Sequence, residues 1–277
     1  MTIVVTGATG HLGRLAIESL LAKGVPAAQI VGIGRQVDKL DGLGITVERA
    51  SYDDPQSLAA AFAGAEKVLF VSGSEVGKRV EQHRNVVDAA KNAGVRLIAY
   101  TSIPFADTTD MKLAADHLAT ERMIAESGVP YAFLRNSWYF ENYNVGRAIE
   151  HGIFGAAGDG KISAAPRADF AEAAAAVLAG EGHEGKVYEL GGDAFTLAEL
   201  AAEISRQSGK PVAYTNLTEE KYIEFLVGAG VPAPYAATLA DSDRAASHGA
   251  LEVPVADMES LLGRPVTPLA EEIKAAL

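Results

Sequence analysis

Short apolar runs alternate with amphipathic stretches through the first half of the chain. Most of the runs are apolar throughout, as expected for strands of a parallel sheet that is covered on both faces. They predict strands at residues 3–6, 30–33, 45–48, 67–72, 97–101 and 131–135. The stretches between them have the spacing and end signals of helices, with Asp54 and Pro55 typical of a helix start and Gly94 and Gly128 of helix ends.

This alternation predicts a Rossmann-type α/β fold, in which a doubly wound parallel sheet is connected by right-handed crossovers. After about residue 146, Gly and Ala become dense and helices dominate. Thr196 and Glu199 form a capping-box pattern, and Thr218 opens a further helix. Residues 187–190 and 212–214 are the remaining predicted strands.

We therefore predict a Rossmann domain over residues 1–145, with later segments returning to the sheet. We expect residues 146–277 to form mainly a smaller, mostly helical C-terminal lobe on the substrate side. This lobe should close over the carboxyl ends of the strands, because ligands of open α/β sheets bind there.

A glycine motif, GATGHLG, directly follows the first predicted strand and opens the first predicted helix. In this context glycines permit a tight turn, let backbone N–H groups approach a pyrophosphate, and let the helix pack closely on the sheet. The N–H groups at the helix start would then face the phosphates. The predicted cofactor-binding residues of the motif are Gly7, Thr9, Gly10, His11, Leu12 and Gly13. The alternative is a glycine turn that serves packing alone.

The residue after the second predicted strand indicates which dinucleotide is bound. NAD sites usually place Asp or Glu there for the ribose 2′-hydroxyl, whereas this chain has Arg35 and no carboxylate before Asp38. A guanidinium matches the charge and geometry of a 2′-phosphate. We therefore predict NADPH as the cofactor, with a solvated surface arginine as the alternative. Ser72, Gly73 and Ser74, at the end of the fourth predicted strand, are further expected contacts.

Composition narrows the class of protein. Hydrophobic residues make up 48% and charged residues 22%, which is typical of a folded chain. No apolar run reaches the roughly 18 residues of a membrane span, and the N-terminus lacks the basic flank of a signal peptide, so we expect a cytoplasmic protein with no membrane partner. The net charge of −12 disfavours nucleic acid. The absence of Cys and the scatter of the six His predict no metal site.

GATGHLG, Arg35, the YTS of residues 100–102 and the LRNSWYFENY of residues 134–143 together resemble the NmrA-like group of atypical short-chain dehydrogenases. Within that group the likeness is strongest to the bacterial NAD(P)H:quinone oxidoreductases, and it covers nearly the whole chain. The resemblance implies NADPH-dependent reduction of small quinones by a Rossmann domain with a small C-terminal lobe. It also implies that the nicotinamide end of the cofactor is lined by Asn136, Ser137, Trp138, Tyr139 and Phe140.

The chain departs from the wider dehydrogenase family in the helix predicted over residues 111–127. That family typically protonates a carbonyl oxygen there with a Tyr-x-x-x-Lys pair, which this chain lacks. His117 and Glu121 lie one turn apart on the same face and are weak candidates for a substitute acid or for orienting a substrate. A surface pair, or a histidine packed under the cofactor, is the alternative.

The missing pair favours a particular electron acceptor. Reducing an ordinary ketone creates a strongly basic alkoxide, which needs a positioned acid, whereas reducing a quinone creates an anion whose charge spreads through the ring. We therefore expect no essential catalytic side chain, with hydride transfer governed by positioning. Tyr139 and Trp138 are candidates to stack on the substrate, unless both are core aromatics.

Two other functions stay open. Some NmrA-like proteins are redox sensors that bind a dinucleotide to control a partner. The group also includes a reductase of cationic triphenylmethane dyes, which are planar and electron-poor as quinones are. The sequence leaves the physiological substrate open, and also whether the chain forms a homo-oligomer.

Overall fold

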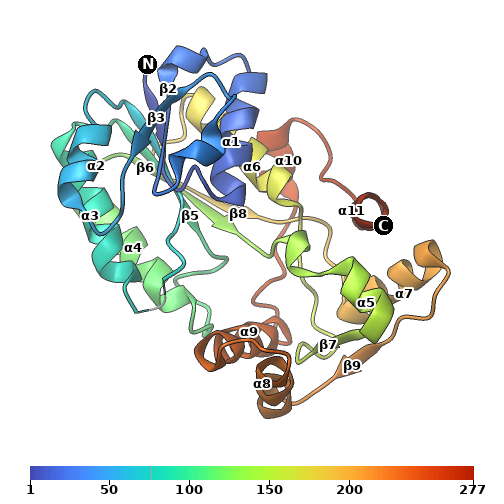
Figure 1. Cartoon of the computed structure of the whole chain (residues 1–277). Helices are drawn as coiled ribbons and strands as arrows, with labels where there is room; N and C mark the ends of the chain where they lie inside the picture. The colour runs from blue at the N-terminus through green and yellow to red at the C-terminus, as the bar shows by residue number, and fades with distance from the viewer. Residues whose placement is uncertain (76) are drawn as a thin grey trace.

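A parallel sheet of seven strands forms the centre of the molecule (Figure 1). The computed structural model describes residues 1–75 and 77–277. The strand order is β3-β2-β1-β4-β5-β6-β8, and every neighbouring pair is parallel. The strands are β1 (Ile3–Val5), β2 (Ile30–Gly34), β3 (Thr46–Arg49), β4 (Lys67–Phe70), β5 (Leu97–Ser102), β6 (Tyr131–Asn136) and β8 (Lys186–Leu190). The predicted doubly wound, Rossmann-type sheet is therefore confirmed.

Helices cover both faces of this sheet. On one face α1 (His11–Ala22), α6 (Arg167–Ala179) and α10 (Ala256–Leu262) pack together, over a core that includes Ile3 and Val5. On the other face α2 (Pro55–Ala61), α3 (Arg79–Asn92) and α4 (Ala114–Ser127) pack over a core that includes Val4. Because successive residues of a strand point to opposite faces, burial on both faces requires the continuous apolar runs seen in the sequence.

A smaller lobe follows the sheet-bearing half. It contains α5 (Val145–His151), α7 (Leu197–Ser208), α8 (Glu219–Gly228), α9 (Ala233–Ala246), α11 (Leu269–Ala276) and a two-stranded parallel sheet of β7 (Ile153–Gly155) and β9 (Tyr214–Asn216). The predicted capping box is present at the start of α7. The Thr196 hydroxyl accepts from Glu199 N at 3.1 Å, and the Glu199 carboxylate accepts from Thr196 N at 2.8 Å. Thr218 caps α8 in the predicted way.

The strands of the second half differ in part from the sequence pattern. The strand predicted over residues 187–190 is β8, which joins the main sheet beside β6. The strand predicted over residues 212–214 begins only at Tyr214 and pairs with β7, for which no strand was predicted. A three-residue strand in a Gly- and Ala-rich stretch is too short to show a periodicity.

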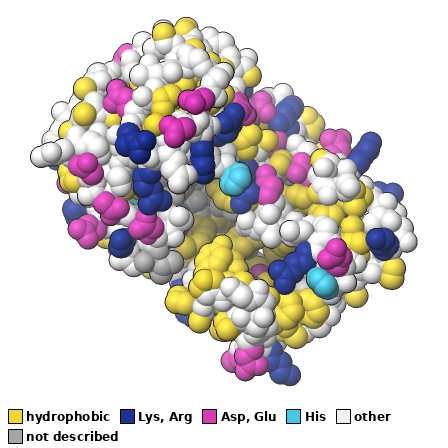
Figure 2. All heavy atoms as spheres, viewed as in Figure 1, with side chains coloured by type: hydrophobic (Ala, Val, Ile, Leu, Met, Phe, Trp, Pro, Cys, Tyr) yellow, Lys and Arg dark blue, Asp and Glu magenta, His cyan; other side chains and the backbone are white. Residues whose placement is uncertain are grey.

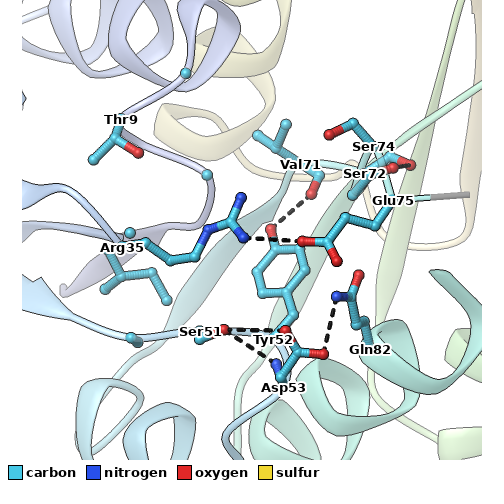
Figure 3. Close-up of a pocket in the computed structure, with 16 residues that line it drawn as sticks. Thr9, Arg35, Ser51, Tyr52, Asp53, Val71, Ser72, Ser74, Glu75 and Gln82 are labelled. Carbon is cyan, nitrogen blue, oxygen red and sulfur yellow. Dashed lines mark hydrogen bonds and ion pairs between the residues drawn. The ribbon is translucent and has the colours of Figure 1, made fainter. Parts of the chain in front are cut away.

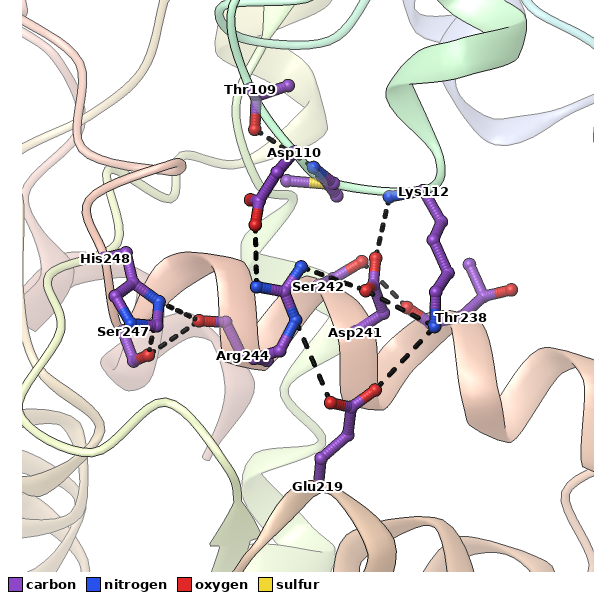
Figure 4. Close-up of polar contacts among 11 residues, drawn as sticks. Thr109, Asp110, Lys112, Glu219, Thr238, Asp241, Ser242, Arg244, Ser247 and His248 are labelled. Carbon is purple, nitrogen blue, oxygen red and sulfur yellow. Dashed lines mark hydrogen bonds and ion pairs between the residues drawn. The ribbon is translucent and has the colours of Figure 1, made fainter.

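Charged side chains join the lobe to the sheet-bearing half (Figure 4). Asp241 of α9, whose side chain is 1% exposed, accepts from the backbone N–H of Lys112 at 2.7 Å. Arg244, also on α9, donates to Asp110 at 2.9 Å. Both Lys112 and Arg244 reach Glu219 at the start of α8, each at 3.8 Å. These contacts fix α8 and α9 against the segment that precedes α4.

Gly13 sets how closely α1 approaches the turn after β1. A Cβ at this position would lie 2.5 Å from the carbonyl oxygen of Gly7 and 2.9 Å from Cα of Ala8. The helix and the turn could not both keep their positions around it. We expect Gly13→Ala to lower the free energy of unfolding by about 1–3 kcal/mol, the usual cost of overpacking, as measured by urea denaturation.

Gly10→Ala is the matched control for this prediction. A Cβ at position 10 would meet only the Gly7 carbonyl oxygen, at 3.3 Å, so a smaller loss is expected. Equal losses of stability in the two variants would contradict a close approach specific to position 13.

Candidate functional site

A cleft of about 250 Å³ opens where β1, β2 and β4 end (Figure 3). The chain builds the sheet outward from β1 in one direction and from β4 in the other, and doubly wound sheets bind ligands in the crevice at such a switch point. The predicted cofactor residues in its wall are Gly7, Thr9, Gly10, Arg35, Ser72, Gly73 and Ser74. The wall also contains Ser51, Tyr52, Asp53, Glu75 and Gln82, which are not among the predicted cofactor-binding residues.

The start of α1 lies beside this cleft, whose lining includes Gly10 but not the predicted cofactor residues His11, Leu12 and Gly13. Gly10 caps the helix, and the regular hydrogen bonds begin with Arg14 N, which donates to Gly10 O at 3.1 Å. The N–H groups of His11, Leu12 and Gly13 therefore have no acceptor among the described residues. Three free donors at a helix N-terminus, beside a residue without a Cβ, fit the pyrophosphate of a dinucleotide.

Arg35 follows β2 and is paired with an acidic side chain at the cleft. Its guanidinium lies 2.9 Å from the carboxylate of Glu75 (Figure 3). The same carboxylate lies 3.5 Å from Lys78. The Arg35 side chain is 69% exposed, and exposed pairs of this kind contribute only about 0–1 kcal/mol. A phosphate dianion, which binds a guanidinium through two hydrogen bonds, can therefore displace Glu75.

The floor of the cleft is a hydrogen-bonded group from three strand ends. The Tyr52 hydroxyl donates to Val71 O at 2.7 Å and lies 2.5 Å from the hydroxyl of Thr6. Gln82 of α3 donates to the carboxylate of Asp53 at 3.0 Å. These bonds hold the ends of β1 and β4 and the segment after β3 at fixed positions. They also keep a carboxylate in the wall, where it can accept from an adenine amino group.

His83 of α3 orients the loop of residues 72–74. Its Nε2 accepts from Gly73 N at 2.9 Å, and its Nδ1 lies 2.7 Å from the Thr120 hydroxyl. Burial, with the charge of Arg79, lowers the pKa of His83 to about 3, so the ring is neutral and Nε2 stays an acceptor. Sequence reasoning missed His83, because a single histidine in a helix gives no sign of the loop beside it.

The segment predicted for the nicotinamide end begins where β6 ends. Asn136 Oδ1 is buried and has no partner among the described residues, so it offers an unused acceptor there. Ser137 donates one hydrogen bond from its backbone N–H to Leu190 O and one from its hydroxyl to Leu251 O. Phe140 is buried in the lobe core. Tyr139 packs edge-on against Phe170, with the Arg167 guanidinium 4.7 Å from its ring centre.

Trp138 lies at a second and larger pocket, of about 650 Å³, within the lobe. Its walls come mainly from α5, β7, α7, α8 and α9, and they include Tyr143, Phe154, Tyr222 and Phe225. Figure 2 shows hydrophobic side chains gathered on this lobe. The structure therefore brings Trp138 to a cavity with room for a ring-shaped ligand.

His117 and Glu121 lie on the buried side of α4 in separate networks. His117 Nδ1 lies 3.0 Å from the Tyr100 hydroxyl, and burial, with the charge of Arg79, lowers the pKa of His117 well below its usual range. Glu121 accepts two hydrogen bonds from Arg135, at 2.9 and 2.7 Å, and one from Ser102 at 2.6 Å. A neutral histidine and a carboxylate bound by a guanidinium are both poor proton donors.

Metal-binding clusters and membrane-spanning helices are both absent from residues 1–75 and 77–277. No group of three or more His, Asp or Glu is arranged to hold a metal ion in this part of the chain. None of its helices is both long and apolar enough to cross a membrane.

The chain is similar to several oxidoreductases. The model of the NmrA-like family matches residues 1–260. Quinone oxidoreductase 2 of Escherichia coli (strain K12) is 53% identical over 278 residues, which cover 98% of this chain and 97% of that protein. The crystal structure of an NADPH-dependent quinone oxidoreductase from E. coli, complexed with NADPH, matches with a TM-score of 0.95 at 52% identity over 99% of both chains. That of Citrobacter sp. triphenylmethane reductase with NADP(H) matches with a TM-score of 0.94 at 44% identity over 100% of both chains.

The pairing of Arg35 leads to a prediction about cofactor choice. Arg35→Ala should weaken NADPH binding by about 1.5–3 kcal/mol, the range for a hydrogen bond to a charged group. NADH has no 2′-phosphate, so its affinity should stay nearly unchanged. Calorimetric titration of both cofactors measures the difference, and equal losses for the two would exclude a role for Arg35 at the 2′-phosphate.

Glu75→Gln is the complementary variant. It leaves Arg35 in place and removes the carboxylate that occupies its guanidinium, so NADPH should bind more tightly than to the unchanged protein. Weaker NADPH binding in this variant would show that Glu75 supports the cofactor instead of competing with it.

Proposed function

The chain belongs to the NmrA-like family, and from this premise we propose that it is an NADPH-dependent quinone oxidoreductase. The observation that carries the proposal is the match, over 99% of both chains, with a quinone oxidoreductase complexed with NADPH. The cleft of this chain supports it independently, because Arg35 lies in its wall after β2. Beside it, three N–H groups at the start of α1 have no acceptor within residues 1–75 and 77–277.

Each end of the cofactor has suitable protein groups. The N–H groups of His11, Leu12 and Gly13 would bind the pyrophosphate, with Gly7, Thr9 and Gly10 forming the turn beside it. Arg35 would bind the 2′-phosphate, and the loop of residues 72–74 would contact the cofactor at the end of β4. Asn136 Oδ1 would accept from the carboxamide at the nicotinamide end. The residues from Ser137 to Phe140 would shape the wall there.

The chain's own residues position the reactants and exclude water. NADPH, when bound, supplies a hydride, and a quinone that receives it becomes a hydroquinone anion, a weak base that water can protonate. No side chain therefore has to deliver a proton. Trp138 lies in the segment that bounds the predicted nicotinamide end, and it also lines the 650 Å³ pocket. We therefore place the quinone, which accepts the hydride, in this pocket. Holding the two rings in contact is then the main catalytic task.

A second candidate is the reduction of triphenylmethane dyes. It is favoured by the 44% identity to a triphenylmethane reductase and by a pocket large enough for a three-ring molecule. Oxidation of NADPH measured against a panel of quinones and dyes tests both functions. Turnover of at least one quinone is expected. If NADPH binds but neither class is reduced, the protein is a dinucleotide-binding sensor and not an enzyme.

The burial of His117 leads to a prediction about proton transfer. His117→Ala should lower the turnover number for quinone only modestly, because the ring is neutral and bonded to Tyr100. A general acid is worth about 10²–10⁴-fold, so steady-state kinetics separate the two cases. A fall of more than about a hundredfold, with NADPH affinity intact, would make His117 the missing acid.

A further inference from the structure

Both backbone polar groups of Gly73, in the loop that follows β4, are held by side chains of α3. His83 Nε2 accepts from Gly73 N at 2.9 Å, and Arg79 Nε donates to Gly73 O at 2.7 Å. The two residues are one helical turn apart, so they lie on the same face of α3. Both are buried, with His83 0% and Arg79 7% exposed. Helix α3 therefore fixes this loop before any ligand enters the cleft.

A second pair of residues, on α4, supports the first pair. Thr120 Oγ1 lies 2.7 Å from His83 Nδ1, and Asp116 Oδ2 lies 3.5 Å from Arg79 Nη1. Thr120 and Asp116 are again one turn apart, and the Thr120 hydroxyl donates to Asp116 O at 2.8 Å. Thr120 is fully buried and does not line the cleft. It can therefore act on a cofactor only indirectly, through residues such as His83 that contact the loop.

The backbone N–H of Gly73 determines where the proton of the His83 ring lies. A peptide N–H is always a donor, so Nε2, which faces it, must be the unprotonated nitrogen. Burial, with the charge of Arg79, lowers the pKa of His83 to about 3, so the ring carries a single proton at neutral pH, and this proton is on Nδ1. The proton points at Thr120 Oγ1, which accepts it while donating its own proton to Asp116 O. Each donor of this chain thus has one acceptor.

The Thr120 hydroxyl makes this position of the proton favourable. His83 Nδ1 has no other hydrogen-bond partner within residues 1–75 and 77–277, so without the hydroxyl it would be a buried donor with no acceptor, which is unfavourable. Moving the proton to Nε2 would instead set two donors against each other at Gly73. Either change loosens the loop from α3. Ser72 and Ser74 of this loop line the cleft (Figure 3), so its position sets how well the wall fits a dinucleotide.

We propose that Thr120 is a positioning residue for NADPH, which keeps the proton of His83 on Nδ1 and so holds the loop of residues 72–74 in place for the cofactor. The inference rests on the proposed function in taking NADPH as the cofactor, but it requires no quinone and no turnover. It gives a role to a hydroxyl that is completely buried where α4 packs against α3.

Two substitutions at position 120 separate the effect of the hydroxyl from that of packing. Thr120→Val keeps the shape of the side chain and removes the hydroxyl, whereas Thr120→Ser keeps the hydroxyl and removes a methyl group. We expect Thr120→Val to raise the Kd of NADPH by about tenfold, which matches the net contribution of one hydrogen bond. Thr120→Ser should bind NADPH nearly as tightly as the unaltered protein. An unchanged Kd in Thr120→Val, or an equal rise in both variants, would overturn the proposal.

Steady-state kinetics give a second readout of the same variants. The proposed quinone site is the 650 Å³ pocket, which shares no lining residue with the loop. Thr120→Val should therefore raise the KM for NADPH and leave kcat nearly unchanged. A fall in kcat with an unchanged KM would place Thr120 in the chemical step and contradict the proposal. Failure of the proposed function would appear in the unaltered protein, as NADPH that binds without reducing any quinone, and it would leave the comparison of Kd values intact.

Nuclear magnetic resonance of the unaltered, ligand-free protein tests the position of the proton without any variant. In an isotope-labelled sample, a coupling across the hydrogen bond from Gly73 N to an imidazole nitrogen identifies His83 Nε2. We expect this nitrogen to have the chemical shift of an unprotonated imidazole nitrogen, with the proton on Nδ1. A proton on Nε2 would overturn the proposal, and this measurement decides the question even if Thr120→Val does not fold.

Discussion

Helix α1 lies so close to the turn after β1 that position 13 has no room for a side chain. This closeness brings the first three N–H groups of the helix to the edge of the sheet with no partner among the described residues. A second close contact lies beside it, since a Cβ on Gly34 of β2 would lie 2.7 Å from the Thr9 side chain. The ends of β1 and β2 and the start of α1 therefore lie very close together, separated mainly by backbone atoms. This packing favours anion binding, because it leaves backbone N–H donors unused at a helix start.

A partly buried ion cluster centred on Arg135 occupies the inner side of α4. Arg135 of β6 binds Glu121, Asp107 at 2.8 Å and Glu189 at 3.1 Å. Glu189 also accepts from the backbone N–H of Phe105, a non-glycine residue with a φ of +50°. The cluster therefore supports a strained backbone at Phe105, just after β5. It also gives Glu121 a structural role, as the ion-pair partner of Arg135. An acceptor that needs no protein acid is consistent with this arrangement.

Much of the fold could be predicted from the sequence, because the relevant signals are local. Mostly apolar runs located the six strands of the first half, although β3 at the sheet edge is largely polar, and the capping residues Asp54 and Thr196 located two helix starts. β7 was missed because three residues give no periodicity. Within the cleft, the residues of the glycine motif and Arg35 could be predicted from the sequence. The pairing of Glu75 with Arg35 and the support of Gly73 by His83 each join residues on different elements, so no local pattern reveals them.

The central claim is that positioning, without a proton from the protein, limits the transfer of hydride to a quinone. The most direct test is the single-turnover rate of reduction of a neutral quinone by NADPH carrying deuterium at the transferred C4 position, measured across neutral pH. We expect the rate to fall on deuteration and to stay flat with pH, because bond breaking at C4 is limiting and no side chain titrates in the step. A rate that is insensitive to deuterium and follows the ionisation of a single group would contradict this, because a protein acid would then control the reaction.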